Sequence, residues 1–290
     1  MTPLQSLNRF IRSHPYLLRW ALRVWRLRIL VLEITAHTRL MLRWFRNSRE
    51  AYNPSYNLTP HNMLELEHFL SLLLNTDLVV IREYVDELLS DDALRKHVQD
   101  VTSQQGARVA ADPEARYGRR LGWYVIIRVL QPNFVVETGI DKGLGTCVIA
   151  SALLKNTNEG QPGRLLAIDI DPSTGWLVGP PYDSVTEIRI DDSSRALTTV
   201  SQTIDLFIHD SIHTEEFETN ELKMVLQKMA PAGMMMSDNA HAGPALMTFA
   251  ESIGRYSYFW REVPEDHYFP GGGIGAINLA QTAPKAPPAT

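Results

Sequence analysis

Two short acidic segments in the 290-residue sequence have the residue types of a metal site. The first is HDSIH at residues 209–213, and the second is DNAH at residues 238–241. Asp210, Asp238 and Asn239 offer carboxylate and amide oxygens, which suit Mg²⁺ or Mn²⁺ better than zinc. The sequence therefore predicts a divalent metal site, although both aspartates could instead cap the helices that follow them.

Each of these segments also contains a histidine within one turn of the acidic residues, His213 in the first and His241 in the second. A histidine with a pKa near 6.5 can accept a proton at neutral pH, so either could act as a general base. An ordinary loop residue held by hydrogen bonds is the alternative for both. We expect His209 to point into the sheet or its neighbour, and it receives no role.

A glycine-containing segment further upstream, ETGIDKGLGT at residues 137–146, has the composition of a ligand-binding turn. Gly139 and Gly143 allow tight turning and close approach of a ligand to the backbone. The spacing matches neither the dinucleotide-binding pattern nor a P-loop. Glu137 precedes Gly139 by two residues, and a carboxylate there suits a cationic amino group better than a phosphate. A structural turn with a solvated glutamate is the alternative.

Two further polar positions follow predicted strands. Asp169 ends the segment RLLAIDI (164–170), where an acid can accept hydrogen bonds from both hydroxyls of a ribose. Asp192 and Ser193 follow the segment VTEIRI (185–190) and suit the edge of an adenine. Each signal is weak alone, but together they indicate a nucleoside site.

The elements that must position these residues form an alternating pattern. Helical stretches follow residue 145 and cover residues 214–229, and they separate β-rich segments, so βαβ units and a mainly parallel sheet are predicted. The predicted strands are 134–138, 164–170, 185–190, 204–209 and 233–238, with 256–262 and 273–279 as a terminal antiparallel pair. The fold class is therefore α/β, with a Rossmann-like sheet whose ligands bind at the carboxyl ends of the strands.

The first 105 residues have a different pattern, because residues 59–76 and 77–100 show helical periodicity without strands between them. The predicted organisation is an N-terminal helical region (1–105), a ligand-binding domain (106–280) and a disordered Pro- and Ala-rich tail (281–290).

Residues 1–50 form a basic arm with ten arginines and two acidic residues, whereas the rest of the chain has 18 basic and 31 acidic residues. Four arginines interrupt the apolar segment 16–35, so we expect neither a membrane span nor a secretory signal there. The arm could pack on its own domain or on a second subunit, lie on an anionic membrane surface, or bind another anionic ligand. Nucleic acid is not expected, because the acidic remainder repels phosphate.

The chain contains one cysteine, Cys147, which excludes a disulfide scaffold and a zinc site built from cysteines. A single thiol suits a reducing compartment. We therefore expect a cytoplasmic protein. We also expect a homo-oligomer, and peripheral membrane contact through residues 1–50 is left open.

Taken together, VVETGIDKGLGT, LLAIDIDP, DLFIHDSIH and MMMSDNAH resemble class I S-adenosylmethionine-dependent methyltransferases. The resemblance is greatest to the metal-dependent O-methyltransferases of small molecules, which act on catechols or on the sugars of natural products. It covers roughly residues 115–279 and leaves out the first hundred.

The resemblance implies a role for each matching position on the cofactor side, with S-adenosyl-L-methionine as the cofactor. Glu137 and Gly139 match the loop that lies against the methionine part. Asp169 matches the acid that holds the ribose hydroxyls, and Asp192 and Ser193 fall where the family contacts adenine.

On the metal side, Asp210, Asp238 and Asn239 match the metal ligands of the catechol branch. The chain departs from that branch at His213, where catechol enzymes have a lysine, so His213 or His241 is the expected base. The implied reaction is metal-assisted methyl transfer to a hydroxyl of a small molecule that carries two neighbouring oxygens. A sugar or glycosylated metabolite is favoured over a phenol, because the motif loops contain no aromatic clamp.

Two other classes of function stay open on the sequence alone. An NAD-dependent oxidoreductase would need a nicotinamide site, against which the missing dinucleotide-binding pattern argues. A membrane-surface or scaffold protein with an inert methyltransferase fold would bind no cofactor.

Overall fold

The computed structural model describes residues 10, 13–49, 55–104 and 114–282. The chain divides into two compact units, of which the smaller comprises Met1–Ser48 with Asp266–Tyr268, and the larger Arg49–Glu265 with Phe269–Thr290. Nearly all of the predicted disordered tail, from residue 283 onward, lies outside the described residues.

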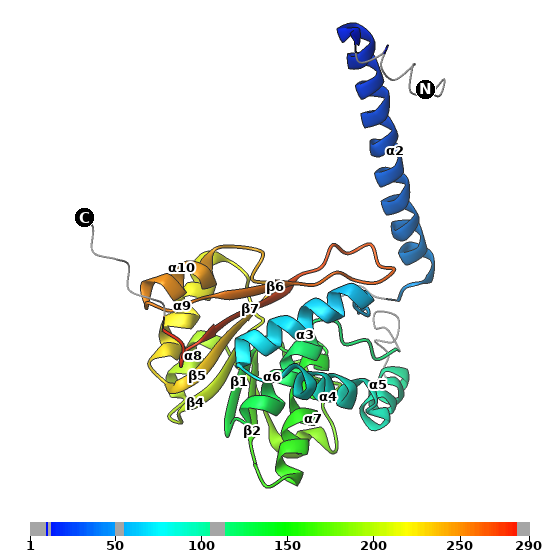
Figure 1. The fold of residues 1–290 in the computed structure, drawn as a ribbon. Helices are drawn as coiled ribbons and strands as arrows, with labels where there is room; N and C mark the ends of the chain where they lie inside the picture. Colours follow the sequence, from blue (N-terminus) through cyan, green and yellow to red (C-terminus); the bar gives the residue numbers. More distant parts are fainter. Residues whose placement is uncertain (1–9, 11–12, 50–54, 105–113, 283–290) are drawn as a thin grey trace, which may run out of the picture. The chain divides into compact units, whose positions relative to one another are not determined.

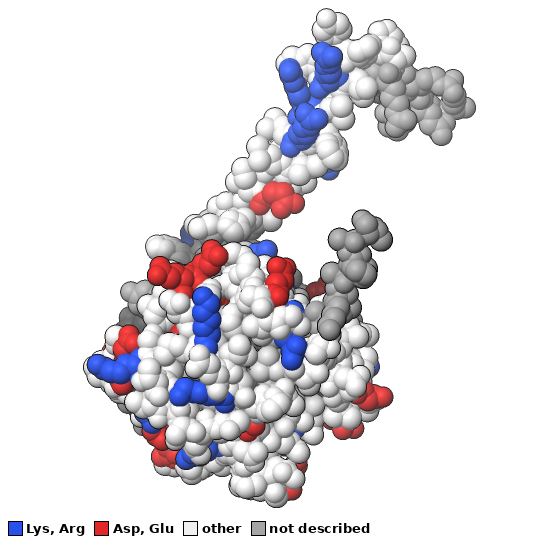
Figure 2. Space-filling model, turned by 90° about the vertical axis from the view of Figure 1, so that its left-hand side faces the viewer, with Lys and Arg blue, Asp and Glu red and all other residues white. Residues whose placement is uncertain are grey.

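The smaller unit consists mainly of α2 (Pro15–Asn47), a 33-residue helix with no buried residue. Proline stands at the start of this helix, where its missing N–H costs nothing. Within the unit, Arg43 forms an ion pair with Asp266 at 3.3 Å, and the rings of Trp44 and Tyr268 lie 4.6 Å apart. Figure 2 shows basic side chains gathered on this helix. Of the helices in the described residues, none is long and apolar enough to cross a membrane.

The larger unit is built on one seven-stranded sheet in the order β3-β2-β1-β4-β5-β7-β6 (Figure 1). The five strands from β3 to β5 pair in parallel, and β7 pairs antiparallel with both β5 and β6. The strands are β1 (Phe134–Thr138), β2 (Arg164–Asp169), β3 (Thr186–Ile190), β4 (Ile204–His209), β5 (Met229–Asp238), β6 (Tyr258–Arg261) and β7 (Gly273–Asn278). This arrangement confirms the predicted Rossmann-like α/β class with a terminal antiparallel strand.

Helices cover both faces of the sheet. Successive residues of a buried strand point to opposite sides, so both faces of the sheet are apolar and need to be covered. Val135 and Leu206 face one hydrophobic cluster, whereas Val136 and Phe207 face the other. The first face is covered by α3 (Pro60–Leu74), α4 (Leu78–Leu89), α5 (Asp92–Gln104), α6 (Arg120–Leu130) and α7 (Leu144–Asn158) (Figure 1). The second is covered by α8 (Ser193–Thr199), α9 (Glu215–Leu226) and α10 (Ala245–Ser252).

The predicted helical region at the N-terminus does not form a unit of its own. Leu70 on α3, Ile81 on α4 and Leu94 on α5 are fully buried in the same cluster as Val135 of the sheet. The larger unit therefore begins at Arg49, not at residue 106, because these short helices need the sheet to bury their apolar faces.

The strand register brings the predicted site residues to one edge of the sheet. Thr138 at the end of β1 pairs with Ile168 of β2 and with His209 of β4, and His209 pairs with Ser237 of β5. The four strands thus end side by side, and the polar residues that follow them share that edge.

Candidate active site at the carboxyl edge of the sheet

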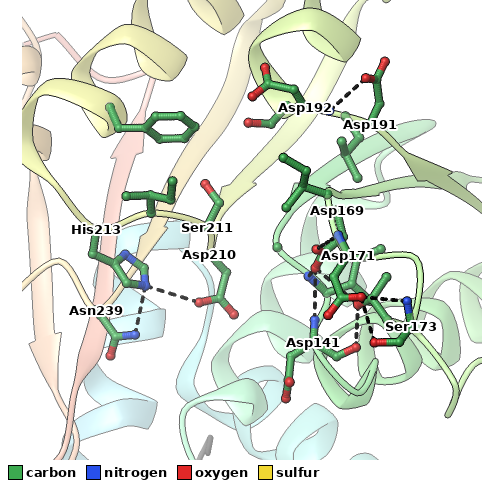
Figure 3. Close-up of a pocket in the computed structure, with 18 of the residues that line it drawn as sticks. Asp141, Asp169, Asp171, Ser173, Asp191, Asp192, Asp210, Ser211, His213 and Asn239 are labelled. Carbon is green, nitrogen blue, oxygen red and sulfur yellow. Dashed lines mark hydrogen bonds and ion pairs between the residues drawn. The ribbon is translucent and has the colours of Figure 1, made fainter.

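A pocket of about 580 Å³ opens at this edge. Acidic and hydroxyl side chains dominate its wall, and Figure 3 shows them in two groups, one around Asp169 and the other around Asp210. Three loops that follow β1, β2 and β3 supply Gly139, Asp169, Asp191, Asp192 and Ser193, and the loops after β4 and β5 supply Asp210, Ser211, His213 and Asn239. A concave site with convergent polar groups is the usual form of a ligand-binding site.

The glycine loop after β1 has a backbone that only glycine adopts without strain. Gly139 has a φ of +88°, and a Cβ there would overlap the carbonyl oxygen of Asp210. Gly143, with a φ of +94°, begins α7 and packs near Gly175 and Val178, outside the wall of the pocket. Gly139 thus allows the loops after β1 and β4 to approach each other closely at the pocket. Gly143 allows the chain to turn into α7, behind the pocket.

Glu137 is almost completely buried, with 1% of its surface exposed. Its carboxylate accepts a hydrogen bond from the Thr146 hydroxyl at 2.7 Å. Burial raises the pKa of Glu137 to about 8, and the nearby charges of Asp210 and Asp169 act in the same direction. The side chain lines a small second cavity next to the main pocket, so its acceptor atoms face an enclosed space that lacks a full counter-charge.

Asp169 holds the glycine loop in place. Its carboxylate accepts backbone hydrogen bonds from Ile140 at 2.7 Å, Asp141 at 3.2 Å and Asp171 at 3.0 Å, with the Thr174 hydroxyl at 3.2 Å. Three of these bonds reach Oδ2, whereas Oδ1 accepts only the one from Asp171, so Oδ1 keeps acceptor capacity for a ribose hydroxyl.

Asp192 and Ser193 lie where the sequence places them, on the wall of the pocket, but both side chains already have partners. Asp192 caps α8 by accepting the N–H of Arg195 at 3.1 Å. The Ser193 hydroxyl donates to the buried Glu221. Its proton is therefore used, and its oxygen and its backbone are the groups left for a ligand.

Asp210 and Asp238, two of the three predicted metal ligands, form an acidic cluster with His213, with one ligand atom from each within 4.8 Å of the others. His213 Nε2 lies 3.6 Å from Asp210 and 3.2 Å from the Asn239 amide nitrogen (Figure 3). The helix-cap alternative does not hold for either aspartate, because Thr214 caps α9 and Pro244 precedes α10.

Arg119 is the main residue of the site that the sequence did not reveal. Its guanidinium donates to both carboxylate oxygens of Asp238 and lies 3.3 Å from both Glu262 and the Tyr56 hydroxyl. Arg119, Asp238 and Glu262 are all buried. A cluster of basic residues in the otherwise apolar segment 119–130 is the one sequence signal that could have indicated it.

Arg119 also divides the charges of the cluster unequally. Burial opposes ionisation of Asp238, but Arg119 outweighs it and holds the pKa of Asp238 below its usual value. Burial and the neighbouring Asp238 raise the pKa of Asp210 instead. Burial also opposes protonation of His213, yet Asp210 outweighs it and raises the pKa of that imidazole. Arg119 thus balances the negative charge of Asp238, whereas Asp210 has no comparable cationic partner.

Neither His209 nor His241 belongs to the three clustered residues, although the ring centroid of His209 lies 5.5 Å from that of His213. His241 is exposed and does not line the pocket, and burial together with Arg261 lowers its pKa. The structure therefore does not bring His241 together with the acidic cluster. His209 is fully buried, as expected, and its Nδ1 lies 2.6 Å from Glu221.

The donor set fits a divalent cation at Asp210. Asp210 has no Arg or Lys within ion-pair distance among the described residues, and its nearest cationic partner is His213. Asp238 keeps lone pairs beyond those that Arg119 uses. In this structure the Asn239 amide nitrogen faces the cluster, so Asn239 would have to turn its amide to become an oxygen ligand. Two carboxylates and an imidazole suit Mn²⁺ as well as Mg²⁺.

Comparison with known proteins finds one similar family of domains. Residues 136–240 match the family model described as a methyltransferase domain. No curated protein matches the sequence significantly.

Similar solved structures include the O-methyltransferase TomG of Streptomyces achromogenes, which is involved in tomaymycin synthesis and was crystallised with S-adenosylmethionine. The two share 16% identity over 67% of this chain and 91% of TomG, with a TM-score of 0.48. A putative O-methyltransferase of Klebsiella pneumoniae shares 14% identity over 71% of this chain and 97% of its own length, with a TM-score of 0.48. An O-methyltransferase of Bacillus cereus in complex with S-adenosylhomocysteine shares 13% identity over 69% of this chain and 97% of its own length, with a TM-score of 0.46.

The family match spans the glycine loop, Asp169 and both acidic segments. Together with the sheet, it bears out the resemblance seen in the sequence. Residues 136–240 of this chain are therefore similar to a methyltransferase domain.

Proposed function

We propose that this protein transfers a methyl group from S-adenosyl-L-methionine to a hydroxyl oxygen of a small molecule. The observation that carries the proposal is the arrangement of one pocket, which runs from Asp169 and Asp192 to the acidic cluster at Asp210. One end has the residues of a nucleoside site, and the other has groups that activate a hydroxyl.

On the cofactor side, Glu137 would accept hydrogen bonds from the ammonium of the methionine part. The loop at Gly139 would lie against the same part, because no side chain blocks its backbone. Asp169 would hold the ribose, and Asp192 and Ser193 would border the adenine. S-adenosylmethionine supplies an electrophilic methyl group on its sulfonium, which these residues hold near the acidic cluster.

On the acceptor side, His213 would take the hydroxyl proton, since its imidazole lies beside Asp210 and has an unpartnered buried Nδ1. General-base help of this kind is worth about 10²–10⁴-fold in rate. Asp210 would orient the imidazole and stabilise its protonated form.

Asp210 and Asp238 would hold a divalent cation, Mg²⁺ or Mn²⁺, with Asn239 as a further ligand after rotation of its amide. Such a cation lowers the pKa of a bound hydroxyl and fixes its direction. If His213 also binds the metal, the base must lie elsewhere, and the variants below separate these roles.

The acceptor that we propose carries two neighbouring oxygens and is a sugar or glycosylated metabolite. The acidic and hydroxyl groups along the wall suit a polyhydroxylated ligand. Trp176 and Phe217 also line the pocket and offer faces to a ring, so a catechol is the contrasting acceptor to test.

The test is a radiolabelled methyl-transfer assay with sugars and catechols, with and without Mn²⁺, alongside calorimetric titration of S-adenosylhomocysteine. Asp210→Asn should abolish transfer and weaken Mn²⁺ binding while S-adenosylhomocysteine still binds. His213→Gln should lower the rate about 10²-fold or more, and the matched variant His241→Gln should keep the wild-type rate. Transfer that persists in Asp210→Asn with EDTA would refute metal assistance. A protein that binds no S-adenosylhomocysteine would be an inert scaffold instead.

For the basic arm we propose either a membrane surface or a second subunit as the partner of α2. Trp20 and Trp25 are about 60% exposed on this arginine-rich helix, which fits both. Flotation with anionic and neutral vesicles, together with light scattering, separates the two. A cytoplasmic location is part of the same proposal, and the single thiol, Cys147, is buried in α7.

A further inference from the structure

Three arginines at the two ends of α6 are buried, and only two of them are paired. Arg119 is held by Asp238 and Glu262, and Arg128 by Glu87 at 2.7 Å and Glu159 at 2.6 Å. Arg120 is equally buried, with 6% of its surface exposed. Among the described residues, its side chain has no hydrogen bond or ion pair, and its Nε is a buried donor without an acceptor.

A buried guanidinium without a counter-ion is costly, because burial removes its hydration and nothing replaces it. The ring of Trp123 has its centroid 5.9 Å from the guanidinium carbon, and the carboxyl groups of Glu137 and Asp238 interact with Arg120 only from beyond ion-pair distance. A contact at that distance is weak. Arg120 therefore has the geometry of a residue whose partner is a ligand.

Arg120 lines the small cavity that adjoins the main pocket, and so does Glu137. No ion pair joins the two side chains within 4.0 Å, although Arg120 is close enough to oppose the rise in the pKa of Glu137. Ile140, Asp141, Trp176 and Asp210 line both the cavity and the main pocket, so the two spaces are neighbours. One cavity thus holds a buried carboxyl group and a buried guanidinium that form no ion pair with each other.

A zwitterion fits this pair of charges. An α-amino acid group carries an ammonium and a carboxylate on one carbon, and the methionine part of S-adenosylmethionine ends in such a group. The ammonium is the partner for Glu137, as the proposed function already states. The carboxylate then needs a donor on the facing wall, and Arg120 has planar N–H donors that match a carboxylate.

We propose that Arg120 binds the carboxylate of the methionine part of the cofactor, so that Glu137 and Arg120 together recognise its amino-acid end. This inference rests on the proposed function, because it assigns the cavity to that cofactor. It adds a specificity-determining residue from the start of α6, outside the segment that matches the methyltransferase family model.

The test compares S-adenosylhomocysteine with its decarboxylated analogue by calorimetry on the full chain. The wild type should bind S-adenosylhomocysteine about 10- to 100-fold more tightly than the analogue, the usual worth of a charge-assisted hydrogen bond. Arg120→Met should bind both ligands with similar, weak affinity. Arg189→Met removes one arginine outside both cavities and should keep the wild-type ratio.

Two results would contradict the inference. The first is an Arg120→Met variant that keeps the wild-type ratio of the affinities for the two ligands. The second is a raised KM for an anionic acceptor in that variant, which would assign Arg120 to the acceptor instead. Ligand-free Arg120→Met should unfold at or above the wild-type temperature, because it loses an unpaired buried charge. Failure of that variant to fold would show a structural role. A wild type that binds neither ligand would refute the proposed function itself, which is a different result.

Discussion

Glu137 should release a proton when the cofactor product binds. The carboxyl group is buried, and Thr146 is its one hydrogen-bond donor among the described residues. Burial, with Asp210 and Asp169 as smaller contributors, raises its pKa to about 8, whereas Arg120 acts in the opposite direction. An ammonium placed against this carboxyl group favours its charged form and should return the pKa to an ordinary value, about 4.3 for a free glutamate.

The size of the effect follows from these two values. At pH 6.5 a group with a pKa of about 8 is more than nine-tenths protonated, and a group with a pKa of about 4.3 is almost fully ionised. Binding should therefore release about one proton per ligand. Because the bound state holds fewer protons, the affinity should rise with pH, by up to about tenfold per pH unit until the pH approaches 8.

Calorimetry of S-adenosylhomocysteine at pH 6.5 in buffers of different ionisation enthalpy measures this number directly. The uncharged sulfur of this ligand avoids a second charge effect at Asp210, and the α-amino group is already protonated at that pH. Glu137→Gln should release no proton, and Asp210→Asn should release somewhat less than the wild type, because it removes one of the charges that raise the pKa of Glu137. Tight binding by the wild type without proton release would refute the assignment of Glu137 to the ammonium.

Two further predictions concern stability and ligand binding. Arg119→Met should lower the free energy of unfolding in urea by about 3–5 kcal/mol, because it leaves Asp238 buried without its cation, and adding Asp238→Asn should recover part of the loss. A loss below about 1 kcal/mol would contradict this account of the pair. Gly139→Ala should abolish binding of S-adenosylhomocysteine, because its Cβ would overlap backbone. Gly160→Ala also places a side chain at positive φ, but in open space, so it should cost only about 1–2 kcal/mol and leave binding unchanged.

The sheet could be predicted from the sequence because its strands are short apolar segments that end in polar residues. The predicted ranges 134–138 and 204–209 agree with β1 and β4 to the residue. The start of β5 at Met229 was missed, because Pro231 lies among its first residues and the register with β4 shifts there.

The acidic positions of the site could also be predicted, because each directly follows a strand whose end lies at the same edge. Their partners could not be predicted. Arg119 and Asp238 are 119 positions apart in the sequence, and Glu262 comes still later, directly after β6. No local sequence pattern therefore connects the three residues. The same holds for Ser193, whose hydroxyl is used by Glu221 on a different helix.

Arg119 and Arg120 show why adjacent residues of one type can have unlike roles. At a helix start, successive side chains point about 100° apart, so one guanidinium faces Asp238 and the other faces the cavity of Glu137. The first makes the acidic cluster less negative and leaves Asp210 as the carboxylate that still needs a cation. The second supplies a positive charge that forms no ion pair with a described protein group. Because Asp210 lines both spaces, a cation bound there and a zwitterion bound beside Arg120 would together balance charges that the chain alone leaves unbalanced.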